Sequence, residues 1–253
     1  MSGHALDLSN CDRRFMAAAL RFGLRHAGLT GTNPAVATLL VDFASTTPRI
    51  VGRGITALGG RPHAERVAID EAGANARGST AYVTLEPCAH HGVTPPCARA
   101  LIDAGGVRVV TAYVDPDIRV DGEGHAMLRA AGIEVVEGVL TKEAGYVLAG
   151  YLTRKKKHRP HVHLKLALSA DGKLGLPGQE VAVTGEETRR QVHLMRAQSD
   201  AILVGAGTAR VDDPGLTCRL PGLASRSPRP IILSGTQLLQ SDLKLFTDMR
   251  SLP

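Results

Sequence analysis

The amino-acid sequence predicts an α/β protein whose sheets are covered by helices. Short apolar stretches typical of buried strands alternate with amphipathic stretches typical of helices along the chain. The length of 253 residues suits one large domain or two ordinary ones. A basic run ending in proline, at 154–160, divides the pattern in two. We therefore expect domains at 1–153 and 161–253, joined by a basic linker at 154–160.

Helices are predicted in the first half where apolar residues recur at helical spacing. Phe15, Met16 and Ala19 show this spacing before Gly28, a residue suited to ending a helix. The run at 80–85 instead has the β-branched and aromatic content of a buried strand. The result is a mixed sheet with helices on both faces. The expected helices are 12–27, 64–75, 96–104 and 125–131, and the expected strands are 36–41, 50–54, 80–85, 107–113 and 133–137.

The second half repeats the alternation of strands and helices. We expect strands at 161–168, 201–204 and 231–233, with a helix at 185–197. Aromatic residues make up 3% of the chain and Trp is absent, so the cores of both halves must be aliphatic.

The net charge of +6 favours anionic partners, either nucleic acid or a phosphorylated metabolite, although a solvated surface with an excess of basic residues explains it equally well. No aromatic residues interleave with the basic run at 154–160, as a surface that stacks single strands would require. No apolar stretch is long enough for a signal peptide or a membrane span. We therefore expect a cytoplasmic protein with neither a nucleic acid nor a membrane as its partner.

Two short segments carry a set of zinc ligands. His63 and Glu65 stand in Pro-His-Ala-Glu, and Cys88 and Cys97 bound a loop of eight residues. A catalytic zinc takes three protein ligands and a water, and one histidine with two cysteines supplies them. Glu65 follows at a predicted helix start, where it can move protons without binding the metal. This order of residues is the signature of zinc-dependent nucleobase deaminases.

A structural zinc is the alternative to a catalytic one. Such a site needs a fourth protein ligand, which His90 or His91 could provide. We favour the catalytic interpretation, with both histidines in the wall of the pocket, because each ligand segment follows a predicted strand and begins a predicted helix.

The long loop between the cysteines resembles that of the bifunctional deaminase–reductase of riboflavin biosynthesis, and differs from the two-residue spacing of cytidine and transfer-RNA deaminases. The resemblance covers essentially the whole chain. In the first half it rests on Asn33-Pro34, Gly52-x-Gly54, Tyr82–Cys88, Thr94–Cys97 and Asp115-Pro116. In the second half it rests on Lys165–Gly172, His193-x-x-Arg196, Asp200–Thr208, Asp212–Pro214 and Leu216-Thr217-x-Arg219.

The resemblance implies a cytidine-deaminase-like three-layer α/β/α domain followed by an incomplete dihydrofolate-reductase-like α/β domain. The first would remove the 2-amino group of 2,5-diamino-6-ribosylamino-4(3H)-pyrimidinone 5′-phosphate with Zn²⁺. The second would reduce the ribosyl group to ribityl with NADPH. We accordingly expect a phosphorylated pyrimidine metabolite as partner and a homodimer as the assembly.

Family positions also imply binding residues. Those for NADPH fall on Leu168, Thr208 and Asp212, although Asp212 can equally be an ordinary acid at a helix end. Those for the substrates fall on Asn33, Arg196, Leu216 and Arg219.

Four residues depart from the family pattern. Thr56 replaces a substrate-facing His, and Val93 replaces an Arg or Lys expected to contact phosphate. Ala37 replaces a Gly beside the pocket, and Glu180 replaces a Ser of the reductase substrate site. We expect weaker or altered binding of the deaminase substrate, with the metal chemistry intact.

The sequence also lacks the Glu-Gly-Gly-type loop that holds the phosphates of the cofactor. We expect the reductase domain to be incomplete in this chain and inactive by itself. Two alternatives stay open at this point. One is a deaminase of free or RNA nucleobases that uses the basic run, and the other is a non-catalytic zinc-stabilised module.

Overall fold

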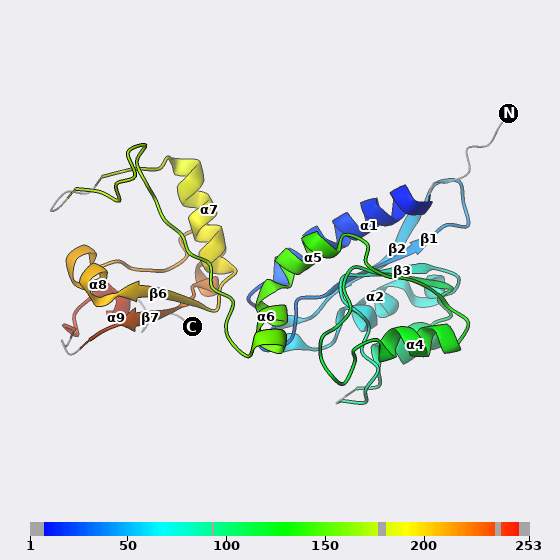
Figure 1. Cartoon of the computed structure of the whole chain (residues 1–253). Helices are drawn as coiled ribbons and strands as arrows, with labels where there is room; N and C mark the ends of the chain where they lie inside the picture. Colours follow the sequence, from blue (N-terminus) through cyan, green and yellow to red (C-terminus); the bar gives the residue numbers. More distant parts are fainter. Residues whose placement is uncertain (1–7, 93, 177–180, 236–238, 248–253) are drawn as a thin grey trace. The chain divides into compact units, whose positions relative to one another are not determined.

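The computed structural model describes residues 8–92, 94–176, 181–235 and 239–247 of the chain. It divides into two compact units, Met1–His161 and Val162–Pro253, here called unit 1 and unit 2 (Figure 1). The segment expected as a linker differs from that expectation, because residues 154–157 complete a helix of unit 1. No helix in the described ranges is long and apolar enough to span a membrane.

Unit 1 is built on a five-stranded mixed sheet, in the order β2-β1-β3-β4-β5. Strand β1 is antiparallel to both β2 and β3, whereas β3, β4 and β5 are parallel. The predicted mixed sheet is therefore confirmed. The strands are β1 (Ala37–Asp42), β2 (Arg49–Ile55), β3 (Thr80–Val83), β4 (Arg108–Thr111) and β5 (Glu134–Val136).

Helices cover both faces of this sheet (Figure 1). Helices α1 and α5 pack over one apolar cluster, and α2, α3, α4 and α6 over the other. The sequence patterns predicted the first four of these helices but missed α5 and α6. The helices are α1 (Leu8–Gly23), α2 (Ala64–Ala72), α3 (Cys97–Asp103), α4 (Glu123–Ala130), α5 (Thr141–Val147) and α6 (Ala149–Lys157), with short 3-10 turns at Leu24–His26, Leu58–Gly60 and Gly73–Ala76.

Two glycines allow α2 to lie directly against β2. A Cβ atom built on Gly52 would lie 2.2 Å from the carbonyl oxygen of Ala68, and one on Gly54 would lie 2.0 Å from that of Ala64. Both contacts are with backbone atoms, which cannot rotate away. The approach fixes the first turn of α2, where His63 and Glu65 are found.

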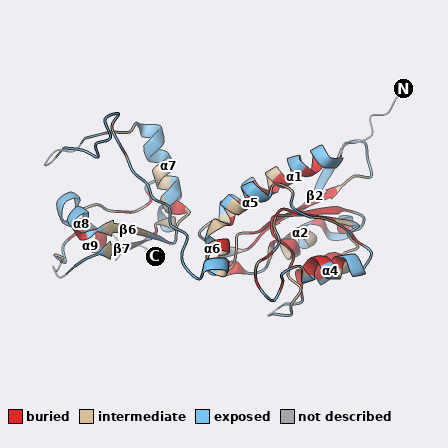
Figure 2. Cartoon of the chain, in the orientation of Figure 1, coloured by how far each residue is buried: buried red, intermediate tan, exposed pale blue. Residues whose placement is uncertain are grey.

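Unit 2 contains a two-stranded parallel sheet within its described residues. Its small apolar cluster centres on Ala209, Leu243 and Leu245, and much of its surface is pale blue in Figure 2, in contrast to the buried sheet of unit 1. The elements are α7 (Glu186–Ala197), β6 (Ala201–Gly205), α8 (Ala206–Asp212), a 3-10 turn at Ala224–Arg226, β7 (Arg229–Leu233) and α9 (Lys244–Thr247).

The strand predicted at 161–168 is wrong, because these residues have no regular secondary structure. Val162, Leu164 and Leu166 alternate as in a strand, but they are 70%, 81% and 55% exposed. The alternation gave a strand-like pattern, yet no neighbouring strand in the described part of unit 2 pairs with this segment. A strand needs such a neighbour to satisfy its backbone groups.

Substitution of Gly54 tests the close packing of α2 on the sheet. We expect Gly54→Ala to lower the free energy of unfolding of unit 1 by about 1–3 kcal/mol, because the added methyl group overlaps a helix carbonyl. Urea denaturation followed by circular dichroism measures the change. Gly150→Ala is the control, since a Cβ atom there meets nothing within 4 Å. Equal stabilities of the two variants would contradict the packing argument.

Candidate metal and catalytic site

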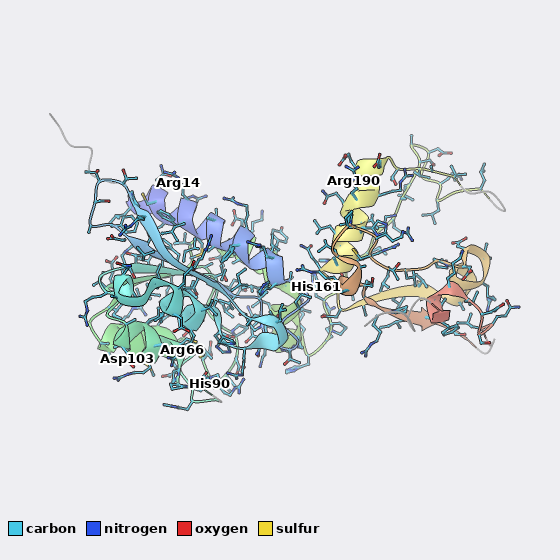
Figure 3. The ribbon with its side chains drawn as sticks, turned by 180° about the vertical axis from the view of Figure 1, so that it is seen from behind. Arg14, Arg66, His90, Asp103, His161 and Arg190 are labelled. Atoms are coloured by element: carbon cyan, nitrogen blue, oxygen red, sulfur yellow. The ribbon has the colours of Figure 1, made fainter. Side chains whose placement is uncertain are left out.

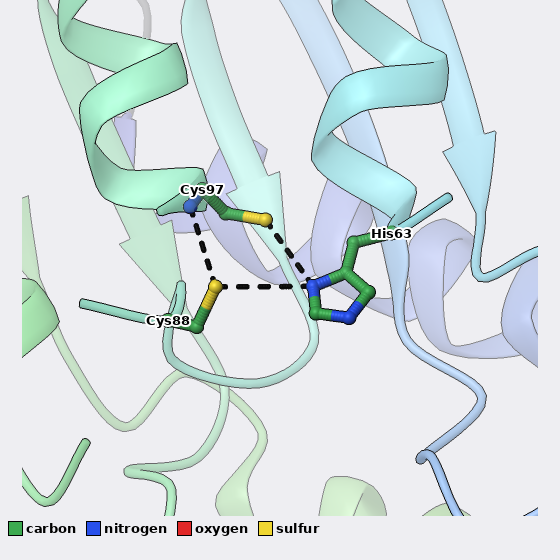
Figure 4. A group of neighbouring side chains, drawn as sticks. All are labelled: His63, Cys88 and Cys97. Atoms are coloured by element: carbon green, nitrogen blue, oxygen red, sulfur yellow. Dashed lines mark hydrogen bonds between the residues drawn. The ribbon is translucent and has the colours of Figure 1, made fainter. Parts of the chain in front are cut away.

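Three side chains from separate elements converge beside the sheet (Figure 4). His63 immediately precedes α2, Cys97 is the first residue of α3, and Cys88 lies on the loop that follows β3. The Nδ1 atom of His63 lies 3.8 Å from the Sγ atom of Cys88 and 3.4 Å from that of Cys97. The three ligand atoms lie within 4.8 Å of one another. Among the described residues no other group of this kind occurs.

The chemistry of these donors fits zinc, which accepts imidazole nitrogen and thiolate sulfur. The backbone N–H of Cys97 donates a hydrogen bond to the Sγ atom of Cys88 at 3.3 Å. Hydrogen bonds from Cys97 and His63 lower the pKa of the Cys88 thiol to about 4, against the opposing effect of burial. A thiolate at Cys88 is the form that binds a metal.

Glu65 lies two residues after His63 and is 3% exposed. Burial raises the pKa of its carboxyl group to about 7, and the negative charge of Cys88 adds to the rise. A carboxyl group that exchanges its proton near neutral pH is suited to general acid–base chemistry.

A cavity of about 280 Å³ connects these residues. His63, Glu65 and Cys88 line it, together with Asn33 and Thr56. Its remaining wall comes from loops and from α6, through Thr32, Pro34, Val36, Arg61, Leu85, Glu86, His90, Asp115, Asp117, Arg119, Val120, Tyr151, Arg154 and Lys155.

His90 lies in this wall, on the loop between the two cysteines (Figure 3). Neither His90 nor His91 belongs to the metal-binding group of the described residues. The group therefore has three protein ligands and borders a cavity, which is the arrangement of a catalytic zinc site.

Hydrogen bonds to Glu86 connect the cavity wall to the metal-binding loop. Its side chain is buried, and its carboxylate accepts hydrogen bonds from four backbone N–H groups. The donors are Asp115 at 3.2 Å, Gly122 at 3.0 Å, Gly124 at 2.9 Å and His125 at 3.3 Å. Glu86 thus joins the segment before Cys88 to the loop before α4.

The residues that depart from the family pattern have different surroundings. The Thr56 hydroxyl accepts a hydrogen bond from the backbone N–H of Val36 at 3.1 Å, so its side chain braces the strands beside the cavity. Ala37 packs with α1 and does not line the cavity. Val93 and Glu180 lie outside the described residues.

Unit 2 brings together some of the residues implied for substrate binding. Arg196 donates from Nη1 to the carbonyl oxygen of Thr217 at 2.9 Å, between Leu216, which is buried, and Cys218. Burial lowers the pKa of Arg196, and the nearby charge of Arg219 lowers it further. Arg196, Leu216 and Arg219 are therefore neighbours.

Of the three residues implied for NADPH binding, two lie on one helix and the third lies in a separate segment. Thr208 and Asp212 lie one turn apart on α8 and are both exposed. Leu168 lies in the irregular segment at 161–168 and is 51% exposed.

Sequence reasoning missed most of the cavity wall contributed by unit 1. Glu86 was passed over although it precedes Pro87-Cys88, and Arg154 and Lys155 were assigned to a linker. Nothing in the local pattern marks Tyr151 as a wall residue, because its place depends on a helix that the sequence did not reveal.

Comparison with known proteins agrees with this geometry. A model of the cytidine and deoxycytidylate deaminase zinc-binding region matches residues 9–113, and one of the RibD C-terminal domain matches residues 160–252. The riboflavin biosynthesis protein RibD of Haemophilus influenzae is 41% identical over 253 residues, which cover 95% of this chain and 67% of that protein. The chain belongs to the RibD family.

Other RibD proteins are similar to the chain. The Escherichia coli protein is 44% identical over 209 residues, covering 82% of this chain and 56% of that protein. The Thermotoga maritima deaminase/reductase structure has a TM-score of 0.85 at 38% identity, covering 94% of this chain and 67% of that one. The chain thus spans between about half and two thirds of the length of these relatives. The predicted fold class, a cytidine-deaminase-like domain followed by a reductase-type RibD domain, is confirmed.

Metal analysis tests the ligand assignment. We expect one zinc per chain, and we expect Cys88→Ala and Cys97→Ala each to lower the zinc content severalfold, because each removes one of three donors. Elemental analysis by plasma mass spectrometry measures this. His90→Ala serves as the control and should keep its zinc. Full zinc content in both cysteine variants would refute the assignment.

The role of Glu86 is tested by an isosteric change. Glu86→Gln replaces one carboxylate oxygen by an amide nitrogen. This nitrogen cannot accept the hydrogen bonds that the backbone N–H groups donate to the oxygen it replaces. We expect unit 1 to lose about 1–3 kcal/mol of stability, the cost of leaving buried donors unpaired. Thermal denaturation provides the measurement, and Glu143→Gln on the exposed side of α5 is the control. A melting temperature equal to that of the control would show that the four hydrogen bonds contribute little.

Proposed function

We propose that unit 1 catalyses zinc-dependent hydrolytic deamination of 2,5-diamino-6-ribosylamino-4(3H)-pyrimidinone 5′-phosphate in riboflavin biosynthesis. The observation that carries the proposal is the metal-binding group beside the buried Glu65 in a single cavity. The names of the relatives support the pathway, since they are riboflavin biosynthesis proteins and one structure is called a deaminase/reductase.

Zinc held by His63, Cys88 and Cys97 would lower the pKa of a water molecule towards about 7, which makes hydroxide available near neutral pH. Glu65 accepts the proton that the water gives up. It then protonates the ring nitrogen beside the carbon that bears the amino group, which makes that carbon electrophilic. Attack by hydroxide forms the new C–O bond. Glu65 then takes the proton of the new hydroxyl group and passes it to the amine as the C–N bond breaks, so that water and the aminopyrimidine become the oxopyrimidine and ammonia.

Asn33 is suited to orient the pyrimidine. Its Nδ2 atom donates to the carbonyl oxygen of Gly60 at 2.9 Å, and a Cβ atom on Gly60 would lie 2.5 Å from that nitrogen. The amide is thereby held in place in the cavity wall. The side-chain Oδ1 atom of Asn33 has no hydrogen-bond partner among the described residues, and it is available to accept a hydrogen bond from the substrate.

We propose that unit 2 belongs to the domain that reduces the deaminated product with NADPH. The substrate positions Arg196, Leu216 and Arg219 support this, because the charge of Arg219 acts on Arg196 and two neighbouring arginines suit a phosphate. Leu168, Thr208 and Asp212 are proposed for NADPH. Because the chain spans about two thirds or less of its relatives, reduction is proposed for a protein that carries their whole second domain. A cytoplasmic location is also proposed, and a homodimer is proposed because the resemblance implies one.

Substitution of Glu65 tests the deaminase mechanism. We expect Glu65→Gln to retain zinc and to release ammonia from the diaminopyrimidinone phosphate at least about 100-fold more slowly, because the amide cannot carry the proton. Glu71→Gln, the same change on the exposed side of α2, should be close to the unsubstituted protein. Loss of zinc from Glu65→Gln, or nearly normal ammonia release, would contradict the assigned role. Release of ammonia from RNA or free bases alone would favour a different deaminase.

A further inference from the structure

The basic run at 154–160 begins inside the cavity of unit 1, where the sequence suggested only a linker. Helix α6 ends at Lys157, and its residues Arg154 and Lys155 line the same cavity as the metal-binding group. Arg119 lines it too, from the loop before α4. We call Arg119, Arg154 and Lys155 the basic rim. Two of the charges that defined the predicted linker, those of Arg154 and Lys155, therefore belong to the cavity wall.

No carboxylate in the described ranges forms an ion pair with Arg154. Its Nη2 atom donates a short hydrogen bond to the carbonyl oxygen of Thr32, the neighbour of Asn33 in the cavity wall. Its guanidinium group lies 5.9 Å from the ring centre of Tyr151, which supports it from the preceding turn of α6. A carbonyl group and an aromatic ring hold the guanidinium in place and leave its positive charge intact.

Lys155 and Arg119 share a single carboxylate. The Nζ atom of Lys155 lies 2.5 Å from Oδ2 of Asp117, and Nη2 of Arg119 lies 2.7 Å from the same oxygen. The hydrogen bonds from Arg119, followed by those from Lys155, hold the pKa of Asp117 well below its usual range. The aspartate is therefore ionised at neutral pH, and it balances one of the two cations.

The second carboxyl group in this part of the wall is Asp115. Its Oδ1 atom accepts a hydrogen bond from the Tyr151 hydroxyl at 2.7 Å, and the side chain contacts none of the three cations through a hydrogen bond or ion pair. Three cations thus share this wall with two carboxyl groups, of which only Asp117 is paired with any of them, so the rim keeps an excess of positive charge. A phosphate monoester carries about −1.5 to −2 at neutral pH.

We propose that the basic rim binds the phosphate group of the substrate in unit 1, so that α6 forms the phosphate subsite of the deaminase. The identity of the anion rests on the proposed function. The geometry favours a small phosphate ester over a polynucleotide, because Arg154 and Lys155 line a cavity of about 280 Å³. The rim and the metal-binding group come from separate segments, since Arg154 and Lys155 lie on α6 and the metal ligands lie at the starts of α2 and α3 and on the loop after β3.

Binding of ribose 5-phosphate tests the subsite without relying on turnover. The zinc-loaded chain is titrated calorimetrically with ribose 5-phosphate, and with ribose as the uncharged match. All proteins carry Arg219→Gln, which weakens binding of anions to the arginine pair of unit 2. We expect Arg154→Gln to weaken binding at least about tenfold, as loss of a charge-assisted contact does. Lys157→Gln removes a charge from the same helix outside the cavity and should change the affinity less than twofold.

Asp117→Asn tests whether removing a negative charge from the rim strengthens phosphate binding. The substitution keeps an oxygen that can accept hydrogen bonds from Arg119 but removes the negative charge that competes with phosphate. We expect ribose 5-phosphate to bind more tightly to this variant, by severalfold. A purely structural role of the rim predicts weaker binding for both Asp117→Asn and Arg154→Gln. Tighter binding by one and weaker binding by the other therefore supports the subsite.

The outcomes separate this proposal from the proposed function. If Arg154→Gln binds ribose 5-phosphate as well as Lys157→Gln does, or if phosphate adds nothing to the affinity of the starting protein, the subsite is overturned whatever the turnover. If the affinities follow the expected pattern but no ammonia is released from the diaminopyrimidinone phosphate, the rim stands and the deaminase substrate is wrong. If both hold, Arg154→Gln should raise KM for the phosphorylated substrate and leave KM for its dephosphorylated form unchanged.

Discussion

The buried carboxylate of Glu86 is the interaction on which the active-site wall depends. It follows β3 by three residues, precedes the ligand Cys88 by two, and holds four backbone N–H groups of the segment from Asp115 to His125. Each bond alone is modest, but together they tie the metal-binding loop to the loop that carries Asp117 and Arg119. The fit requires Gly124, where a Cβ atom would lie 2.0 Å from the carbonyl oxygen of Pro87.

The sheet topology explains why the metal ligands meet. The parallel strands β3 and β4 place their carboxyl ends at one edge, and the loop after β3 leads through Cys88 to Cys97 at the start of α3. His63 lies at the start of α2, which is pressed against β2 through Gly52 and Gly54. Two helix N-termini therefore point at one site, and the backbone N–H groups there favour thiolates.

The sequence was sufficient to predict the metal ligands and the proton carrier of the site. It was insufficient to predict most of the other residues that line the cavity. The metal ligands and Glu65 were predictable because ligand type and spacing reflect local chemistry. Glu86 was not, since its donors follow it by 29 to 39 residues and are backbone groups, which no side-chain pattern marks. Helix α6 was hidden by its basic last turn, which resembles a linker in composition. The strand expected at 161–168 shows the reverse error, because alternation alone does not supply a pairing neighbour.

Charge is distributed unequally along the cavity, and this bears on how a substrate would lie in it. Near the metal ligands, burial raises the pKa of Glu65, so this carboxyl group can take up and release a proton near neutral pH. In the wall formed by α6 and the loop before α4, Asp117 balances only one of the two cations that pair with it. An anionic group is therefore attracted to the cations of α6, whereas an amino-bearing ring would have to reach Glu65 and the metal ligands to react. A ligand with a phosphate at one end and an amino-bearing ring at the other would be oriented by these two regions before any hydrogen bond from Asn33 selects the ring.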